Sequence, residues 1–198
     1  MAMGIFGALP ITDGSVYLNG KEITIRNPGD AIRHKIAYVP EDRKVLGLDL
    51  NTRICNNISL TNMDIVAPKG FLDHRKEREI SKNMVEKLKI KTPSVFQEAG
   101  NLSGGNQQKV VLAKWLSREL DVLILDEPTR RVDIGAKEEI HKLISKLAGE
   151  GLGIILISSE MTEVLGMSDR VLVMHEGQQK VILDASQATQ EKVMSYAV

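Results

Sequence analysis

Two short segments of this chain carry residue types that could hold a phosphate group and a metal ion. The first reads LSGGNQQK over residues 102–109 and places two glycines directly before an amphipathic helix. Unpaired N–H groups at the start of such a helix carry the positive end of its dipole and suit a phosphate. Ser103 can cap the helix, while Gly104 and Gly105 leave the backbone open to a ligand. The alternative is an ordinary glycine-containing loop before a core helix.

The second segment reads LILDEPT over residues 123–129. It places Asp126 and Glu127 where an apolar strand ends. At that point one carboxylate can hold Mg²⁺ and the next can orient an attacking water. The alternative is a strand that ends in solvent, with both carboxylates as turn residues.

The second half of the chain alternates between amphipathic and continuously apolar segments, which predicts strands buried on both faces and therefore a mainly parallel α/β sheet. Such sheets carry functional loops at the carboxyl ends of their strands. The expected helices are about 106–120, from about 135, and about 160–165, and the expected strands are 122–125, 154–157, 171–174 and 180–183.

The first hundred residues predict two different kinds of structure. Asn19-Gly20 lies between two short strand-like runs and is the favoured dipeptide for a two-residue hairpin turn. Residues 36–39 form another apolar run. The stretch 43–100 is more polar and helical in pattern, with Asp73 as a helix cap. The charged run 73–79 is interpreted as a solvated helix face.

Composition narrows the class of protein. The 198 residues are 42% hydrophobic and 26% charged, which is typical of a globular domain. The formal net charge is zero, so no basic excess indicates nucleic-acid binding. The single cysteine excludes an internal disulfide, and no apolar run reaches the roughly 20 residues that span a bilayer.

Taken together and in this order, the two segments resemble the ATP-binding-cassette family. LSGGNQQK is similar to its signature motif and LILDEPT to its Walker B segment. The resemblance then places Glu41 at the glutamine position of the Q-loop, Asp133 in the D-loop, and Ser159 where most relatives carry the switch histidine. VPEDRK and the segments after it resemble the second, C-terminal cassette of the ribose/galactose/arabinose/xylose class of bacterial sugar importers.

The resemblance implies a P-loop NTPase-like fold in one partial domain, residues 1–198. A helical subdomain of about 43–105 would accompany an α/β core made of 1–42 and 106–198. ATP and Mg²⁺ are the implied cofactors, with Asp126 on the metal and Glu127 as the general base that orients water. The signature residues implied to contact ATP across a dimer are Ser103, Gly104, Gly105, Asn106 and Gln107.

No P-loop motif G-x-x-x-x-G-K-[ST] occurs in this sequence. The only Gly-Lys pair, Gly20-Lys21, has Ser15 at the first glycine position and Glu22 after the lysine. In the family, the stretch that resembles residues 5–10 ends the helix after the P-loop. We therefore expect that the P-loop strand and loop are missing, and that the isolated chain neither binds ATP tightly nor hydrolyses it at a useful rate.

The family also implies partners and a location. These are a second cassette packed head to tail, transmembrane permease subunits of a sugar importer, and a cytoplasmic position on the inner face of the bacterial inner membrane. Two further readings stay open. One is a catalytically incompetent cassette that only dimerises or donates its signature, and the other is a member that acts outside transport, in DNA repair or translation.

Arg131 departs from the family pattern, which usually has glycine there. In one interpretation the arginine crowds the close backbone approach that the D-loop makes across the dimer. In the other it points to solvent and is tolerated.

Overall fold

The computed structural model describes residues 1–197 and divides into two compact units. The first runs from Met1 to Ile155, and the second begins at Leu156. The first unit starts with α1 (Ala2–Ile5), the antiparallel pair β1 (Val16–Leu18) and β2 (Lys21–Ile23), and α2 (Pro28–Arg33). Asn19 and Gly20 both have positive φ, at 51° and 75°, which confirms the predicted two-residue turn.

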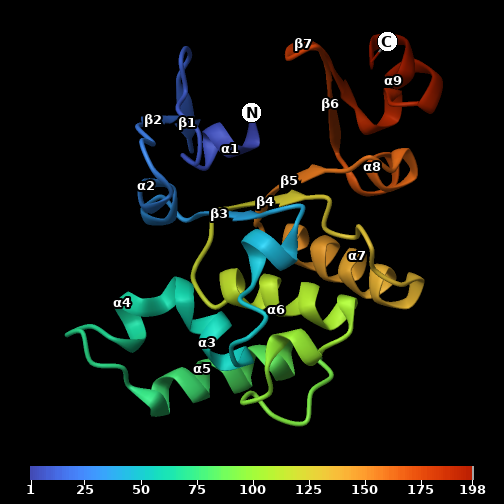
Figure 1. The fold of residues 1–198 in the computed structure, drawn as a ribbon. Helices are drawn as coiled ribbons and strands as arrows, with labels where there is room; N and C mark the ends of the chain where they lie inside the picture. Colours follow the sequence, from blue (N-terminus) through green and yellow to red (C-terminus); the bar gives the residue numbers. More distant parts are fainter. Residues whose placement is uncertain (198) are drawn as a thin grey trace. The chain divides into compact units, whose positions relative to one another are not determined.

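A three-stranded sheet has the strand order β3–β4–β5, with β3 and β4 in the first unit and β5 across the boundary at Ile155 (Figure 1). Its strands are β3 (Ile36–Val39), β4 (Val122–Asp126) and β5 (Gly153–Ile157). β3 and β4 run parallel, with Val39 opposite Leu125. All of β3 and the centre of β4 are buried, as the continuous apolar runs predict.

Helix α6 (Gly104–Leu116) contacts β3 and the helices of the segment before it (Figure 1). Ten of its residues are buried, Trp115 among them, because neighbours cover more than one of its faces. The surrounding helical elements are η1 (Arg43–Gly47, a π-helical turn), α3 (Ile54–Ser59), η2 (Leu60–Asn62), α4 (Met63–Val66), α5 (His74–Lys87) and η3 (Ala99–Asn101). Helix α7 (Ile134–Gly149) follows β4 and also contacts α6.

In helix α5 the predicted cap is confirmed, and the prediction of a fully solvated face over residues 73–79 is wrong. The carboxylate of Asp73 accepts bonds from the backbone N–H groups of Arg75 and Lys76. The charged run 73–79 is not wholly solvated, because Glu77 is buried and accepts a 2.9 Å hydrogen bond from the hydroxyl of Ser59. A partner from α3 offsets the cost of burying this carboxylate.

The second unit contains α8 (Met161–Met167), β6 (Arg170–His175), β7 (Gln178–Asp184), η4 (Ala185–Gln187) and α9 (Gln190–Ala197). β6 and β7 pair antiparallel, in contrast to the parallel β3–β4 pair. Their turn, Glu176-Gly177, has φ values of 48° and 77°. Burial alternates along β6, so it covers a core on one face only, made with Leu183 and Val193.

Candidate functional site

The carboxyl ends of β3 and β4 lie side by side, because the two strands are parallel and in register. Tyr38 near the end of β3 donates a 2.7 Å hydrogen bond from its hydroxyl to Oδ2 of Asp126, the last residue of β4. Burial, and secondarily this bond, raise the pKa of Tyr38, so the phenol keeps its proton and remains the donor. The candidate metal ligand is therefore oriented by a neighbour that the sequence analysis did not single out.

Glu127 has a positive φ of 48°, a conformation that costs a non-glycine residue free energy. Its carbonyl oxygen accepts a bond from the N–H of Arg130, which closes a tight turn directly after the strand. The turn continues into Thr129, which is buried. The candidate general base therefore sits at a sharply bent, half-buried strand end.

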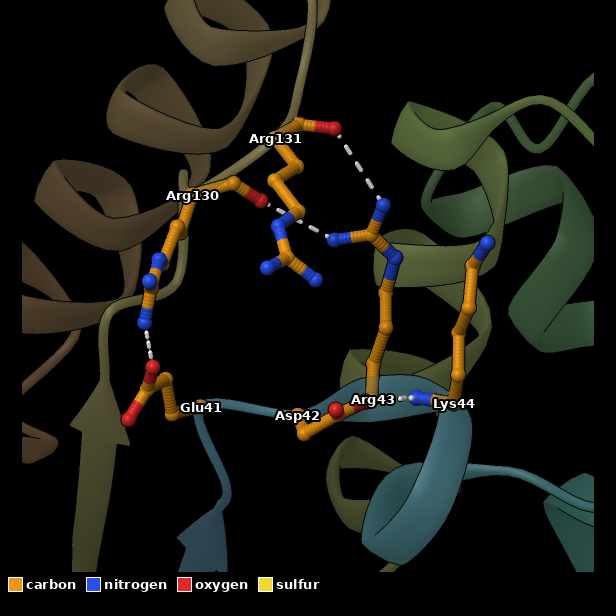
Figure 2. A pocket seen from close by; sticks show the side chains of 6 residues that line it. All are labelled: Glu41, Asp42, Arg43, Lys44, Arg130 and Arg131. Atoms are coloured by element: carbon orange, nitrogen blue, oxygen red, sulfur yellow. Dashed lines mark hydrogen bonds and ion pairs between the residues drawn. The ribbon is translucent and has the colours of Figure 1, made fainter.

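A side-chain ion pair links the loops that follow β3 and β4. Glu41, at the Q-loop position, pairs with the guanidinium of Arg130 (Figure 2). Both side chains are about half exposed, at 49% and 48%, so solvent weakens the attraction and its contribution to stability is small.

Arg43 makes the stronger connection between the same two loops. It lies in η1, only 7% exposed, and donates from Nη1 to the carbonyl of Arg130 at 3.0 Å and from Nη2 to the carbonyl of Arg131 at 3.2 Å (Figure 2). A planar guanidinium can satisfy two carbonyl groups at once, which an ammonium group cannot do in the same geometry. Arg43 therefore fixes the backbone of residues 130–131 relative to η1.

The glycine pair of the signature-like segment packs against this same structure. A Cβ atom at Gly104 would lie 2.8 Å from Nη2 of Arg43 and 3.2 Å from the carbonyl of Arg131. A Cβ atom at Gly105 would collide with the Cβ of Ala136 in α7. Within the chain itself, both glycines therefore permit close contact with the loop that Glu127 begins.

Ser103 occupies the N-cap position of α6, as predicted, but its side chain makes no capping hydrogen bond. Its hydroxyl instead accepts a 2.9 Å bond from Nδ2 of Asn106, whose Oδ1 accepts from the N–H of Lys91 at 2.8 Å. No side chain among the described residues therefore caps the first turn of α6.

Gln107 lies inside the protein rather than at a surface. It is 5% exposed, and its amide nitrogen lies within hydrogen-bond distance of the carbonyls of Ala99, Gly100 and Leu102. The side chain thus holds the loop that leads into α6. Any contact with a ligand would have to come from the backbone at this position.

The D-loop-like residues differ in their local roles. Asp133 is the N-cap of α7, and its carboxylate accepts from the N–H of Ala136 at 2.9 Å. Arg131 has a left-handed backbone with φ of 56°, the conformation that the glycine usual at this position adopts without strain.

The exposed Ser159 follows β5 and belongs to the second unit, where neighbouring Ser158 accepts from the N–H of Glu160.

Two observations bear on metals and membranes. Within residues 1–197, no group of three or more His, Cys, Asp or Glu side chains is arranged to hold a metal ion. Mg²⁺ bound with a nucleotide needs only one or two carboxylates besides phosphate oxygens, so Asp126 alone fits such a site. In the described part of the chain, no helix has both the length and the apolar character that crossing a bilayer requires.

Comparison with solved structures identifies the fold as that of an ATP-binding cassette. The dimeric, post-hydrolysis structure of the cassette MJ0796 bound to ADP and Pi superimposes with a TM-score of 0.75 at 19% identity, over 93% of this chain and 79% of that one. The cassette MJ1267 gives 0.80 at 21% identity, over 98% and 81%.

The chain belongs to the ABC transporter family, whose family model matches residues 1–130. It is 51% identical over 198 residues to a protein of Burkholderia ambifaria named putative ribose/galactose/methyl galactoside import ATP-binding protein 3. It is also 47% identical over 193 residues to the ribose import ATP-binding protein RbsA of Bacillus licheniformis. The chain spans 39% of the length of each of these relatives, and they match 100% and 98% of it.

Proposed function

We propose that this chain is part of the ATP-binding, energy-coupling subunit of a bacterial carbohydrate importer. The observation that carries the proposal is the close approach of the signature-like helix start to the loop that Glu127 begins, since a Cβ atom at Gly104 would lie 3.2 Å from the carbonyl oxygen of Arg131. The 51% identity to an import ATP-binding protein over the whole chain supports the sugar class.

In this proposal the chain contributes two parts to nucleotide sites shared with a second cassette packed head to tail. Ser103, Gly104, Gly105 and the uncapped first turn of α6 would face the phosphates of a nucleotide bound to the partner cassette. Asn106 would hold the Ser103 hydroxyl, as it does here. Asp133 would act in the D-loop, and Ser159 would stand at the catalytic position where most relatives carry the switch histidine.

Asp126 would bind Mg²⁺, which neutralises charge on phosphate oxygens when present. Tyr38 keeps one oxygen of that carboxylate engaged and so fixes its orientation. Glu127 would accept a proton from, or orient, an attacking water at the bent end of β4. Glu41 would act at the Q-loop, where it is tied to Arg130 and hence to the loop after β4.

The same proposal assigns a helical subdomain to residues of about 43–105 and a core to 1–42 and 106–198. Permease subunits in the membrane would be further partners, which places the chain on the cytoplasmic face of the inner membrane. Nucleic acid is not a proposed partner, because acidic and basic residues balance at 26 each.

A second candidate is a module that dimerises and lends its signature without turning over ATP itself. Residues 1–198 contain no G-x-x-x-x-G-K-[ST] loop, which favours this role for the chain alone. The two candidates differ in whether Glu127 matters for turnover.

The test pairs this chain with a sugar-import cassette that carries its own P-loop and measures phosphate release. We expect turnover to exceed that of either partner alone, and Ser103→Arg to abolish the gain by blocking the first turn of α6. The matched control is Ser145→Arg, at an exposed position of α7. Unchanged turnover in Ser103→Arg would refute both candidates.

In the same pair, loss of turnover in Glu127→Gln supports the catalytic role, and retained turnover supports the signature-only role.

The chain alone should show no micromolar Mg·ATP binding by titration calorimetry. Micromolar binding by the chain alone would contradict this expectation.

A further inference from the structure

A cavity of about 90 Å³ opens between the loops that follow β3 and β4 (Figure 2). All its lining side chains are charged, four cationic and two acidic: Glu41, Asp42, Arg43, Lys44, Arg130 and Arg131. A space of this size holds several water-sized groups, so it can also accept a tetrahedral oxyanion. Figure 2 shows the side chain of Arg131 reaching into the open space toward Arg43.

The two acidic side chains of the cavity are already engaged. Glu41 pairs with Arg130, and one oxygen of Asp42 accepts from the backbone N–H groups of Lys44 at 2.9 Å and Val45 at 3.2 Å. The cavity therefore carries an excess of positive charge that its own carboxylates do not pair.

Three cations of the cavity form no salt bridge among the described residues. Arg43 is bonded to neutral carbonyl groups only, and neither Lys44 nor Arg131 has a carboxylate within ion-pair distance. Burial is the main cause of the lowered pKa of Arg43. The negative charge of Asp42 acts against this lowering, and the positive charge of Arg131 adds to it. A buried guanidinium beside a second cation is costly unless an anion neutralises the pair.

The backbone of Arg131 adds an independent observation. Its φ of 56° is a conformation that glycine adopts freely and arginine only with backbone strain. Strain of this kind clusters at ligand-binding sites. Here it accompanies a guanidinium directed into a charged cavity rather than a side chain that points away (Figure 2).

We infer that this cavity binds a phosphate group, with Arg131 and Lys44 as side-chain ligands and Arg43 as the buried charge behind them. Arginine forks match the oxygens of phosphate in pairs, and lysine adds a point charge. The group can come from free inorganic phosphate or from a nucleotide. The inference does not depend on the proposed function, because binding by this chain requires neither a second cassette nor turnover.

The test titrates the chain with inorganic phosphate at constant ionic strength and follows backbone amide shifts by NMR. We expect saturable shifts at residues 41–44 and 130–131. Arg131→Gly and Lys44→Gln should each weaken the apparent affinity by about tenfold, as loss of a charged hydrogen bond predicts. Arg131→Lys should recover part of the loss, because it restores the charge.

Lys89→Gly is the matched control. Lys89 is also exposed, cationic and left-handed, with φ of 50°, but it does not line the cavity. It should change the affinity less than twofold, since no phosphate ligand is lost. Equal weakening in Lys89→Gly and Arg131→Gly would reduce the effect to general charge attraction and overturn the inference, as would shifts that do not saturate.

Parallel titrations with pyrophosphate and ADP identify the source. Tighter binding of ADP than of pyrophosphate, lost in Arg131→Gly, would assign the site to a nucleotide. Equal or weaker binding of ADP would assign it to a free oxyanion. Either result supports a phosphate site, whereas binding of both compounds unaffected by Arg131→Gly would overturn it.

Discussion

The guanidinium of Arg43 lies 3.2 Å, through Nη2, from the carbonyl oxygen of Arg131, and the same nitrogen occupies the space that a side chain at Gly104 would need. One buried side chain therefore connects η1, the loop after β4 and the start of α6. In the proposed function, the signature-like turn and the acidic strand end act at the two different nucleotide sites of a cassette pair, and this contact would set the spacing between them.

Arg43→Lys should lower the free energy of unfolding by about 1–3 kcal/mol, because one ammonium group cannot satisfy both carbonyls in this geometry. Urea denaturation monitored by circular dichroism measures the change. Lys44→Arg, at the exposed neighbouring position, is the control and should stay within about 0.5 kcal/mol of the original chain. Equal stability of the two variants would show that the Arg43 contacts contribute little.

Gly105→Ala should destabilise the chain by about 1–3 kcal/mol, because the new methyl group meets the Cβ of Ala136 in a packed region. Gly149→Ala is the control, since nothing lies within 4 Å of its added methyl. Ala136→Gly should offset part of the loss in the double variant. A double-mutant cycle with no coupling between positions 105 and 136 would contradict the predicted contact.

Arg131→Gly should raise thermal stability by about 0.5–1 kcal/mol, because glycine adopts a φ of 56° without strain. Calorimetry of the two chains measures this difference. The same substitution should weaken phosphate binding, so stability and affinity are expected to change in opposite directions. A loss of stability would mean that the arginine side chain makes favourable contacts that outweigh its backbone strain.

Dimer formation, measured before and after the substitution, tests whether Arg131 crowds a neighbouring cassette.

Lys114 makes the free energy of unfolding depend on pH. Burial lowers its pKa from 10.5 to about 8, while its ammonium group donates to the carbonyl of Gly47 at 2.5 Å. Between these two pH values the unfolded chain binds more protons than the folded one, so stability rises with pH by up to about 3 kcal/mol from this group. Below pH 8 the penalty is fully present, and above 10.5 it is absent.

Denaturation at pH 8 and at pH 10.5 measures how much the free energy of unfolding rises with pH. Lys114→Met should reduce this rise, whereas Lys142→Met should leave it unchanged, because the side chain of Lys142 is 78% exposed. The same rise in both variants would show that Lys114 titrates normally.

The sequence by itself determined the features that depend on neighbouring residues. The hairpin turn at Asn19-Gly20, the cap at Asp73, the N-cap position of Ser103 and the apolar strand that ends at Asp126 all follow from local backbone preference and periodicity. The fold class and the family resemblance rest on these local patterns and their order along the chain.

Only the tertiary structure decided which distant residues meet. Arg43 reaches carbonyls 87 and 88 positions away, Tyr38 orients Asp126, and Glu77 is buried against α3 instead of facing solvent. A carbonyl acceptor has no side-chain identity, so no pattern of residue types could have predicted the bonds of Arg43. The sequence predicted that the glycine pair leaves room for a ligand, and packing alone revealed that the Cβ positions of Gly104 and Gly105 are blocked by Arg43 and Ala136.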